Sequence, residues 1–195
     1  MRKLKLQVQI TVDGYIVGPN GEMDWMVWDW DDKLKRYVAD LTEPVDCIIL
    51  GRKLAQGFIP HWANIASIPE SQDFSAGKKF TDTQKVVFTK TLDTKDSIVS
   101  GWKNTVLAKG DLVDEINQLK TKKGKDIIVY GGATFVSALV KNQLIDEFHL
   151  FINPNAIGNG MAIFNELESN QKLTLLKSES FDCGIVVLKY EKHQN

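Results

Sequence analysis

The chain has 195 residues, of which 25% are charged, and a formal net charge of −1. This length suffices for one domain with a full hydrophobic core, and the charge lacks the basic excess typical of nucleic-acid-binding proteins. No apolar run approaches the ~20 residues that cross a bilayer, and residues 1–5 lack the apolar centre of a signal peptide. We therefore expect a single domain over residues 1–195 of a soluble, cytoplasmic protein, without nucleic-acid or membrane partners. Two isolated cysteines, Cys47 and Cys183, are typical of buried apolar positions, and we expect no metal site.

The first predicted strand leads into a glycine-rich loop. Apolar residues at positions 4, 6, 8 and 10 alternate with polar ones, which predicts a strand with one face inward. Residues 12–21 include three glycines, a proline and an asparagine, a composition typical of a long, mobile loop. Tyr15, Ile16 and Val17 make its tip apolar. That tip is equally consistent with a lid over a ligand and with a loop folded onto its own core.

A tryptophan-rich segment follows this loop. Three tryptophans, including Trp25 and Trp28, fall within six residues and lie among four acidic residues. Flat apolar groups beside carboxylates suit a planar, hydrogen-bonding heterocycle, although part of the cluster is expected in the core. Asp31 or Asp32 is suited to cap the helix predicted over residues 34–41.

Three strand-to-helix or strand-to-loop turns share a composition that suits phosphate groups. They follow buried-type apolar runs at 45–50, 85–88 and 126–130. The turns are Gly51-Arg52-Lys53, Thr89-Lys90-Thr91 and Gly131-Gly132. Glycines allow a ligand to approach the backbone, and the amides that open a helix attract anions. Singly, a tight turn, chance surface cations or an ordinary polar loop would explain each of them.

Together, the three turns predict a dinucleotide site. Ligands of open α/β sheets bind outside the carboxyl ends of the strands, so three such turns on one edge suit an elongated, multiply phosphorylated ligand. A lysine between two threonines also suits a 2′-phosphate. The usual G-x-G-x-x-G fingerprint is absent from the first turn.

The remaining elements complete an alternating α/β pattern. We expect an irregular segment over residues 60–84, a short strand at 97–100, and helices over 111–119 and 133–141. A strand with Phe148, Leu150 and Ile152 on one face ends at Pro154. The chain closes with two strands around the turn at residues 182–184.

Five short motifs follow one another along the chain in an order that is typical of one superfamily. They are Asp13-Gly14 with Ile16, Leu50-Gly51-Arg52-Lys53, Thr89-Lys90-Thr91, Tyr130-Gly131-Gly132-Ala133, and Leu144-Ile145-Asp146-Glu147-Phe148 with Pro154 and Gly158-Asn159-Gly160. Their order and spacing over about residues 3–190 resemble the dihydrofolate reductase superfamily. The nearest likeness is to the reductase half of the bifunctional riboflavin-biosynthesis deaminase-reductase and its stand-alone relatives. The zinc signature of the deaminase half is absent.

The resemblance implies an α/β fold of three layers, α/β/α, with a mixed, mostly parallel central sheet and a C-terminal antiparallel hairpin. It implies NADPH as the cofactor, held at three turns and beside the nicotinamide. The implied cofactor-binding residues are Gln9, Ile16, Gly51, Arg52, Lys53, Thr89, Lys90, Thr91, Gly131, Gly132, Ala133 and Thr134. We expect a small heterocyclic substrate to contact Val17, Trp25, Trp28 and Trp62, with residues 17–21 as the lid.

The resemblance also bears on catalysis and assembly. Folate reductases place one carboxylate on the helix after the lid, and Asp31 or Asp32 falls near that place as the catalytic acid. The long segment between Trp25 and Gly51 favours the riboflavin branch. We therefore expect an NADPH-dependent reductase of a pyrimidine- or pterin-like compound, resembling 5-amino-6-(5-phosphoribosylamino)uracil reductase. The alternatives are a dihydrofolate reductase proper and a non-catalytic nucleotide-binding protein of the same fold; riboflavin-type relatives are commonly homodimers.

Overall fold

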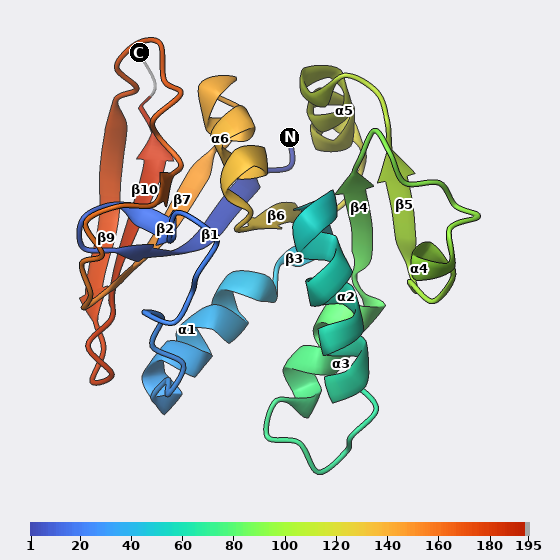
Figure 1. The fold of residues 1–195 in the computed structure, drawn as a ribbon, viewed down its shortest axis with the longest axis horizontal. Coiled ribbons are helices and arrows are strands. Elements are labelled where there is room, and N and C mark those ends of the chain that lie inside the picture. The colour runs from blue at the N-terminus through green and yellow to red at the C-terminus, as the bar shows by residue number, and fades with distance from the viewer. Residues whose placement is uncertain (194–195) are drawn as a thin grey trace.

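One eight-stranded sheet with helices on both faces forms the body of the molecule (Figure 1). The computed structural model describes residues 1–193. The main sheet contains β1 (Leu4–Thr11), β3 (Val45–Gly51), β4 (Gln84–Phe88), β5 (Thr105–Ala108), β6 (Asp126–Tyr130), β7 (Glu147–Asn153), β9 (Leu173–Ser180) and β10 (Val186–Lys192). Two short strands, β2 (Tyr15–Val17) and β8 (Met161–Ala162), pair with each other as a separate ribbon.

The sheet is mostly parallel. Its order is β5-β4-β3-β6-β1-β7-β10-β9. The pairs from β5 through to β7 are all parallel, whereas β10 pairs antiparallel with both β7 and β9. The expected mixed sheet with a C-terminal antiparallel hairpin is therefore confirmed.

The helices form a layer on each face. Three helices cover one face, namely α1 (Asp32–Thr42), α2 (Arg52–Ile65) and α3 (Phe74–Asp82), and two cover the other, namely α5 (Leu112–Thr121) and α6 (Ala133–Lys141) (Figure 1). The single turn α4 (Ser97–Ser100) precedes β5. Successive strand residues point to opposite layers: Ile49 packs in the core beside α5 and α6, and Ile48 packs in the core beside α2 and α3. A continuous apolar run is therefore buried on both sides, as a central parallel strand requires.

The first strand differs from its prediction. The alternating pattern predicted one inward face, but both faces of β1 are buried, and even Lys5 and Gln7 are only 8% and 7% exposed. The reason is its place in the sheet, because β1 lies between β6 and β7 and has helices on both sides. Its polar side chains are retained by pairing, as when the Lys5 ammonium lies 2.9 Å from the Asp126 carboxylate.

Two segments differ from their sequence-based assignments. Residues 60–84 are mostly helical rather than irregular, since α2 continues through Pro60 to Ile65 and α3 follows. Residues 97–100 form the helical turn α4 rather than a strand, and the strand of this region, β5, begins at Thr105. Segments that contain prolines, glycines and short apolar runs show little hydrophobic periodicity, so their secondary structure depends on tertiary packing. Within residues 1–193, no helix is both long and apolar enough to cross a membrane.

Candidate active site at the carboxyl edge of the sheet

The three predicted phosphate turns lie next to one another. They follow β4, β3 and β6, which are consecutive neighbours in the sheet. The registers align these strand ends, because Gly51 pairs with Phe88 at the end of β4 and Ile49 pairs with Val129 near the end of β6. The carboxyl ends of parallel strands meet at one edge, where open α/β sheets bind their ligands.

The two glycine turns pack against each other. A Cβ at Gly51 would lie 2.9 Å from the Cβ of Phe135 on α6, so this position has no room for a side chain. Gly131 and Gly132 have φ angles of +21° and +80°, in the region that favours glycine. Hypothetical Cβ atoms there would lie 4.0 and 3.9 Å from Leu54 on α2. The start of α2 and the start of α6 therefore form one continuous surface.

Both of these helices begin without a side-chain cap. Gly51 and Gly132 occupy the N-cap positions of α2 and α6 and have no side chain to accept from the first amides. By contrast, the carboxylates of Asp31 and Asp111 cap α1 and α5 by accepting hydrogen bonds from backbone N–H groups of the first turn. The uncapped amides and the positive ends of two helix macrodipoles thus converge on the same place, which suits an anion.

Cations add to this potential at the start of α2. Arg52 is half-buried and Lys53 is exposed, and neither forms an ion pair within residues 1–193. Cations in the first turn of a helix oppose its macrodipole, so local helix stability does not explain them. A bound anion would explain them.

The third turn presents one lysine to solvent. Thr89 is buried, and its hydroxyl oxygen accepts from the backbone N–H groups of Thr91 and Leu92 at 3.1 and 3.0 Å. Thr89 therefore shapes the turn, whereas Lys90 and Thr91 are exposed and available to a ligand.

The apolar tip of the glycine-rich loop is packed against the rest of the molecule. Ile16 is only 3% exposed and belongs to the main core, and β2 pairs with β8. The carboxylate of Asp13 accepts from the backbone N–H groups of Ile157 and Gly158 at 3.0 and 2.7 Å. Hydrogen bonds from the Thr11 hydroxyl and from Gly158 lower the pKa of Asp13, so it accepts as a carboxylate at neutral pH. Of the two interpretations of this loop, the structure shows its central apolar residue packed on the core.

Asn153 joins this edge to the tryptophan-rich segment. Its side chain is fully buried, its Nδ2 donates to the Gln9 Oε1 at 2.7 Å, and its Oδ1 accepts from the Val27 N–H at 2.8 Å. Asn155 donates to the Trp25 carbonyl at 2.8 Å. Asn153, the last residue of β7, and Asn155 just beyond it therefore hold the tryptophan-rich segment against β1 and β7. From the sequence, Asn153-Pro154 is a feature that favours the riboflavin-type branch, but the sequence does not predict the hydrogen bonds of Asn153.

The tryptophans of this segment differ in exposure. Trp25 is 8% exposed, and its indole nitrogen is shielded from solvent without a hydrogen-bond partner in residues 1–193. Trp28 is 67% exposed. Trp62 is not brought to this edge at all, because it lies ten residues into α2, about 15 Å along the helix axis from Arg52.

The two candidate acids have different surroundings. Asp31 is the N-cap of α1, and its two carboxylate oxygens accept from Leu34 N–H at 2.8 Å and from Cys183 N–H at 3.2 Å. The hydrogen bond from Leu34, together with that from Cys183, lowers the pKa of Asp31. Asp32 is exposed and makes no side-chain hydrogen bond or ion pair within the described chain. The predicted capping role is therefore confirmed for Asp31.

The sequence profile of the RibD C-terminal domain matches residues 2–187. The chain belongs to the RibD C-terminal domain family. This is a family of riboflavin-biosynthesis-type reductase domains with a dihydrofolate reductase-like fold, as the order of motifs predicted.

Relatives of this RibD-family chain extend over nearly its whole length. The protein YyaP of Bacillus subtilis strain 168 is 30% identical over 193 residues, which cover 97% of this chain and 94% of YyaP. A riboflavin biosynthesis-related protein of Shewanella sp. PV-4 is 25% identical, with a TM-score of 0.72 and full coverage of both chains. The Thermotoga maritima deaminase/5-amino-6-(5-phosphoribosylamino)uracil reductase is 17% identical with a TM-score of 0.68, and the match covers 98% of this chain and 57% of that one.

One buried polar network of this RibD-family chain escaped sequence reasoning. The Tyr37 hydroxyl on α1 lies 2.7 Å from the His149 Nδ1, and the His149 Nε2 lies 2.7 Å from the Glu147 carboxylate. Burial lowers the pKa of His149, so the neutral ring accepts from Tyr37 and donates to Glu147. Burial alone would raise the pKa of Glu147, but the hydrogen bond from His149 and the charge of Lys189 lower it to about 2. The available signal was the i, i+2 spacing of Glu147 and His149 on one strand face.

Proposed function

We propose that this protein is an NADPH-dependent oxidoreductase that reduces a pyrimidine- or pterin-like heterocycle. The proposal rests on one observation. The uncapped N-termini of α2 and α6 and the Thr89–Thr91 turn follow three strands that are neighbours in the sheet, so they lie side by side at its carboxyl edge. Membership of the RibD C-terminal domain family supports it, as does the reductase activity named for the Thermotoga relative.

The residues at this edge fit a phosphorylated dinucleotide. In this proposal the start of α2, with Arg52 and Lys53, holds one phosphate, and residues 131–134 hold the pyrophosphate through backbone amides. Close approach is possible because Gly131 and Gly132 carry no side chain over this surface. Lys90 and Thr91, both exposed, take the 2′-phosphate.

The tryptophan-rich segment would provide the substrate side. When bound, NADPH supplies the hydride, and the chain contributes positioning and exclusion of water. Gln9 is oriented by Asn153, while Ile16 and Val17 are held beside β8. Trp25, whose indole N–H has no hydrogen-bond partner within residues 1–193, would border this side as a mostly buried flat group.

Titration with NADPH and NADH, followed by tryptophan fluorescence, tests the cofactor. Losing a charge-assisted hydrogen bond costs ~1.5–3 kcal/mol. Lys90→Ala should therefore lower the affinity for NADPH at least about tenfold and leave the affinity for NADH unchanged. Lys95→Ala, an exposed lysine on the same connection, is the matched control and should bind both cofactors as the parent does. Equal affinity of the parent protein for NADH and NADPH would contradict the 2′-phosphate assignment.

Turnover separates the substrate branches. NADPH oxidation with a ribosylamino-pyrimidine, and not with dihydrofolate, would support the riboflavin-type reaction; the reverse would identify a dihydrofolate reductase. Tight NADPH binding without turnover of either would favour the non-catalytic alternative.

The acid is tested by two amide substitutions. Asp31→Asn keeps the N-cap of α1, because asparagine caps about as well as aspartate, and Asp32→Asn removes an exposed carboxylate. The variant that loses turnover while keeping cofactor affinity identifies the group. If both variants turn over at the parent rate, neither residue is the catalytic acid.

A further inference from the structure

A cavity lies at the opposite edge of the sheet from the glycine turns. Its volume is about 320 Å³, and it is enclosed by the second half of α2, the end of α3, the start of β4 and the segment before β5. Helices α3 and α4 lead into the amino ends of β4 and β5, which places the cavity at the amino edge. None of residues 51–53, 89–91 or 131–134 lines it.

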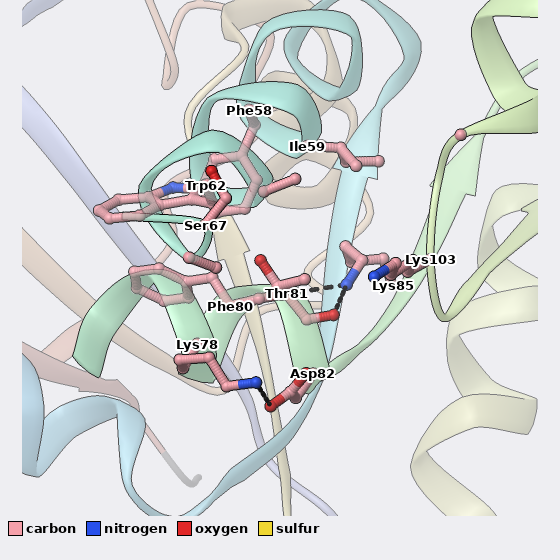
Figure 2. A pocket seen from close by; sticks show the side chains of 13 residues that line it. Phe58, Ile59, Trp62, Ser67, Lys78, Phe80, Thr81, Asp82, Lys85 and Lys103 are labelled. Carbon is pink, nitrogen blue, oxygen red and sulfur yellow. Dashed lines mark hydrogen bonds and ion pairs between the residues drawn. The ribbon is translucent and has the colours of Figure 1, made fainter. Parts of the chain in front are cut away.

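One wall of this cavity is aromatic. The rings of Trp62 and Phe80 have centroids 4.5 Å apart, and Phe58 contacts both at 6.1 and 5.7 Å (Figure 2). Trp62 is only half-buried, so the wall is accessible from the cavity. Flat apolar faces of this kind suit a planar ring.

The facing wall is cationic. Figure 2 shows Lys85 and Lys103 across the cavity from the aromatic rings, with Lys78 at its rim. The only acid among the lining residues is Asp82, whose carboxylate lies 3.3 Å from the Lys78 ammonium. Three cations against one carboxylate give the cavity a net positive charge.

The two lysines of that wall have different roles. The Lys85 ammonium donates to the carbonyls of Phe80, Thr81 and Thr83 at 3.0, 2.8 and 2.7 Å, so it contributes charge but no remaining hydrogen bond. Burial lowers the pKa of Lys85 to about 8. Lys103 is exposed and has no ion-pair partner in residues 1–193, so its ammonium is the available donor.

The geometry points to a second binding site, for a small planar anion such as an aromatic carboxylate or sulfonate. The ring lies against Trp62 and Phe80, and the anionic group is bound by the Lys103 ammonium, with the charge of Lys85 behind it. The cavity is at the lower end of the size range of small-molecule sites, which is ~300–1,000 Å³. This site is independent of the proposed reductase activity, because it shares no lining residue with the carboxyl edge.

Two fluorescent probes test the site on the whole protein. The first is 1-anilinonaphthalene-8-sulfonate, and the second is N-phenyl-1-naphthylamine, which has the same rings without the sulfonate. We expect saturable binding of the sulfonate with one site per chain and much weaker binding of the neutral probe. Equal affinity of the two probes, or no saturable binding of the sulfonate below about 100 µM, would overturn the proposal.

Charge reversal locates the probe. Lys103→Glu should lower the affinity for the sulfonate probe at least about tenfold, since a hydrogen bond to a charged group is lost and a charge repulsion is added. Lys35→Glu makes the same change of net charge on the exposed face of α1 and should leave affinity unchanged. A probe bound at the glycine turns would be insensitive to Lys103→Glu, and that result would refute the assignment. NADPH binding should be unchanged in Lys103→Glu, which separates this test from that of the proposed function.

Discussion

Replacing Gly132 by alanine tests the backbone of the proposed pyrophosphate turn. Gly132 has a φ of +80°, and an added Cβ would lie 3.9 Å from the nearest atom, the Cβ of Leu54, which is an ordinary contact. The cost is therefore conformational rather than steric. A left-handed backbone costs an L-residue ~1–2 kcal/mol, and the smaller unfolded-state entropy of alanine offsets ~0.4–1 kcal/mol. The net loss of stability should be about 1 kcal/mol.

A second glycine provides a control of opposite sign. Gly57 lies inside α2, a Cβ added there meets no atom within 4 Å, and its φ is outside the left-handed region. Gly57→Ala should stabilise the protein by ~0.5–1 kcal/mol, because alanine is the better helix former.

Urea unfolding of the parent and both variants provides the measurement. The midpoint should fall in Gly132→Ala and rise in Gly57→Ala with unchanged m-values. For a chain of this size, 1 kcal/mol corresponds to ~2–4 °C in Tm. A Gly132→Ala protein as stable as the parent would refute the left-handed conformation, and with it the reason for glycine at this turn.

Two further predictions concern the buried polar groups of β7. Asn153→Ala leaves the Val27 N–H and the Gln9 Oε1 unpaired, so it should cost about 2 kcal/mol or more in urea unfolding. Asn153→Asp keeps the acceptor for Val27 but places a buried carboxylate oxygen against the Gln9 Oε1 and the Phe151 carbonyl, so it should cost at least as much. The folded pKa of Glu147 is lowered from 4.5 to about 2, so the unfolded state binds more protons between these values. Stability should therefore fall as pH drops from 4.5 towards 2, as measured by thermal unfolding. Glu147→Gln should reduce that slope, and an unchanged slope would contradict the buried pairing with His149.

Local patterns predicted several elements well. The apolar run before Gly131 and the amphipathic segment after it form β6 and α6 as expected, since a buried strand and a helix have different periods. Asp31 caps its helix as predicted, because a carboxylate before a helix can satisfy its first amides whatever the fold. Both successes depend only on neighbouring residues.

Segments with weak local signals were missed. Pro60 and Gly57 made the length of α2 hard to predict. In the structure Ile59 of α2 packs in the core against α3 and the sheet. The strand β5 has only four residues and forms by pairing with β4. In both cases contacts with distant parts of the chain outweigh a weak local propensity for helix or strand.

The sequence by itself determined the central strands and several of the helices, the cap of α1, and the three turns suited to phosphate, because each of these depends on a few adjacent residues. Only the tertiary structure decided which of these features lie together. Parallel pairing put the turns after β4, β3 and β6 side by side, while the direction of α2 carried Trp62 to the other edge of the sheet. The contacts of Asn153 with Gln9 and Val27, and of His149 with Tyr37, join residues more than a hundred positions apart. Such contacts follow from strand order and register, which local sequence patterns do not encode.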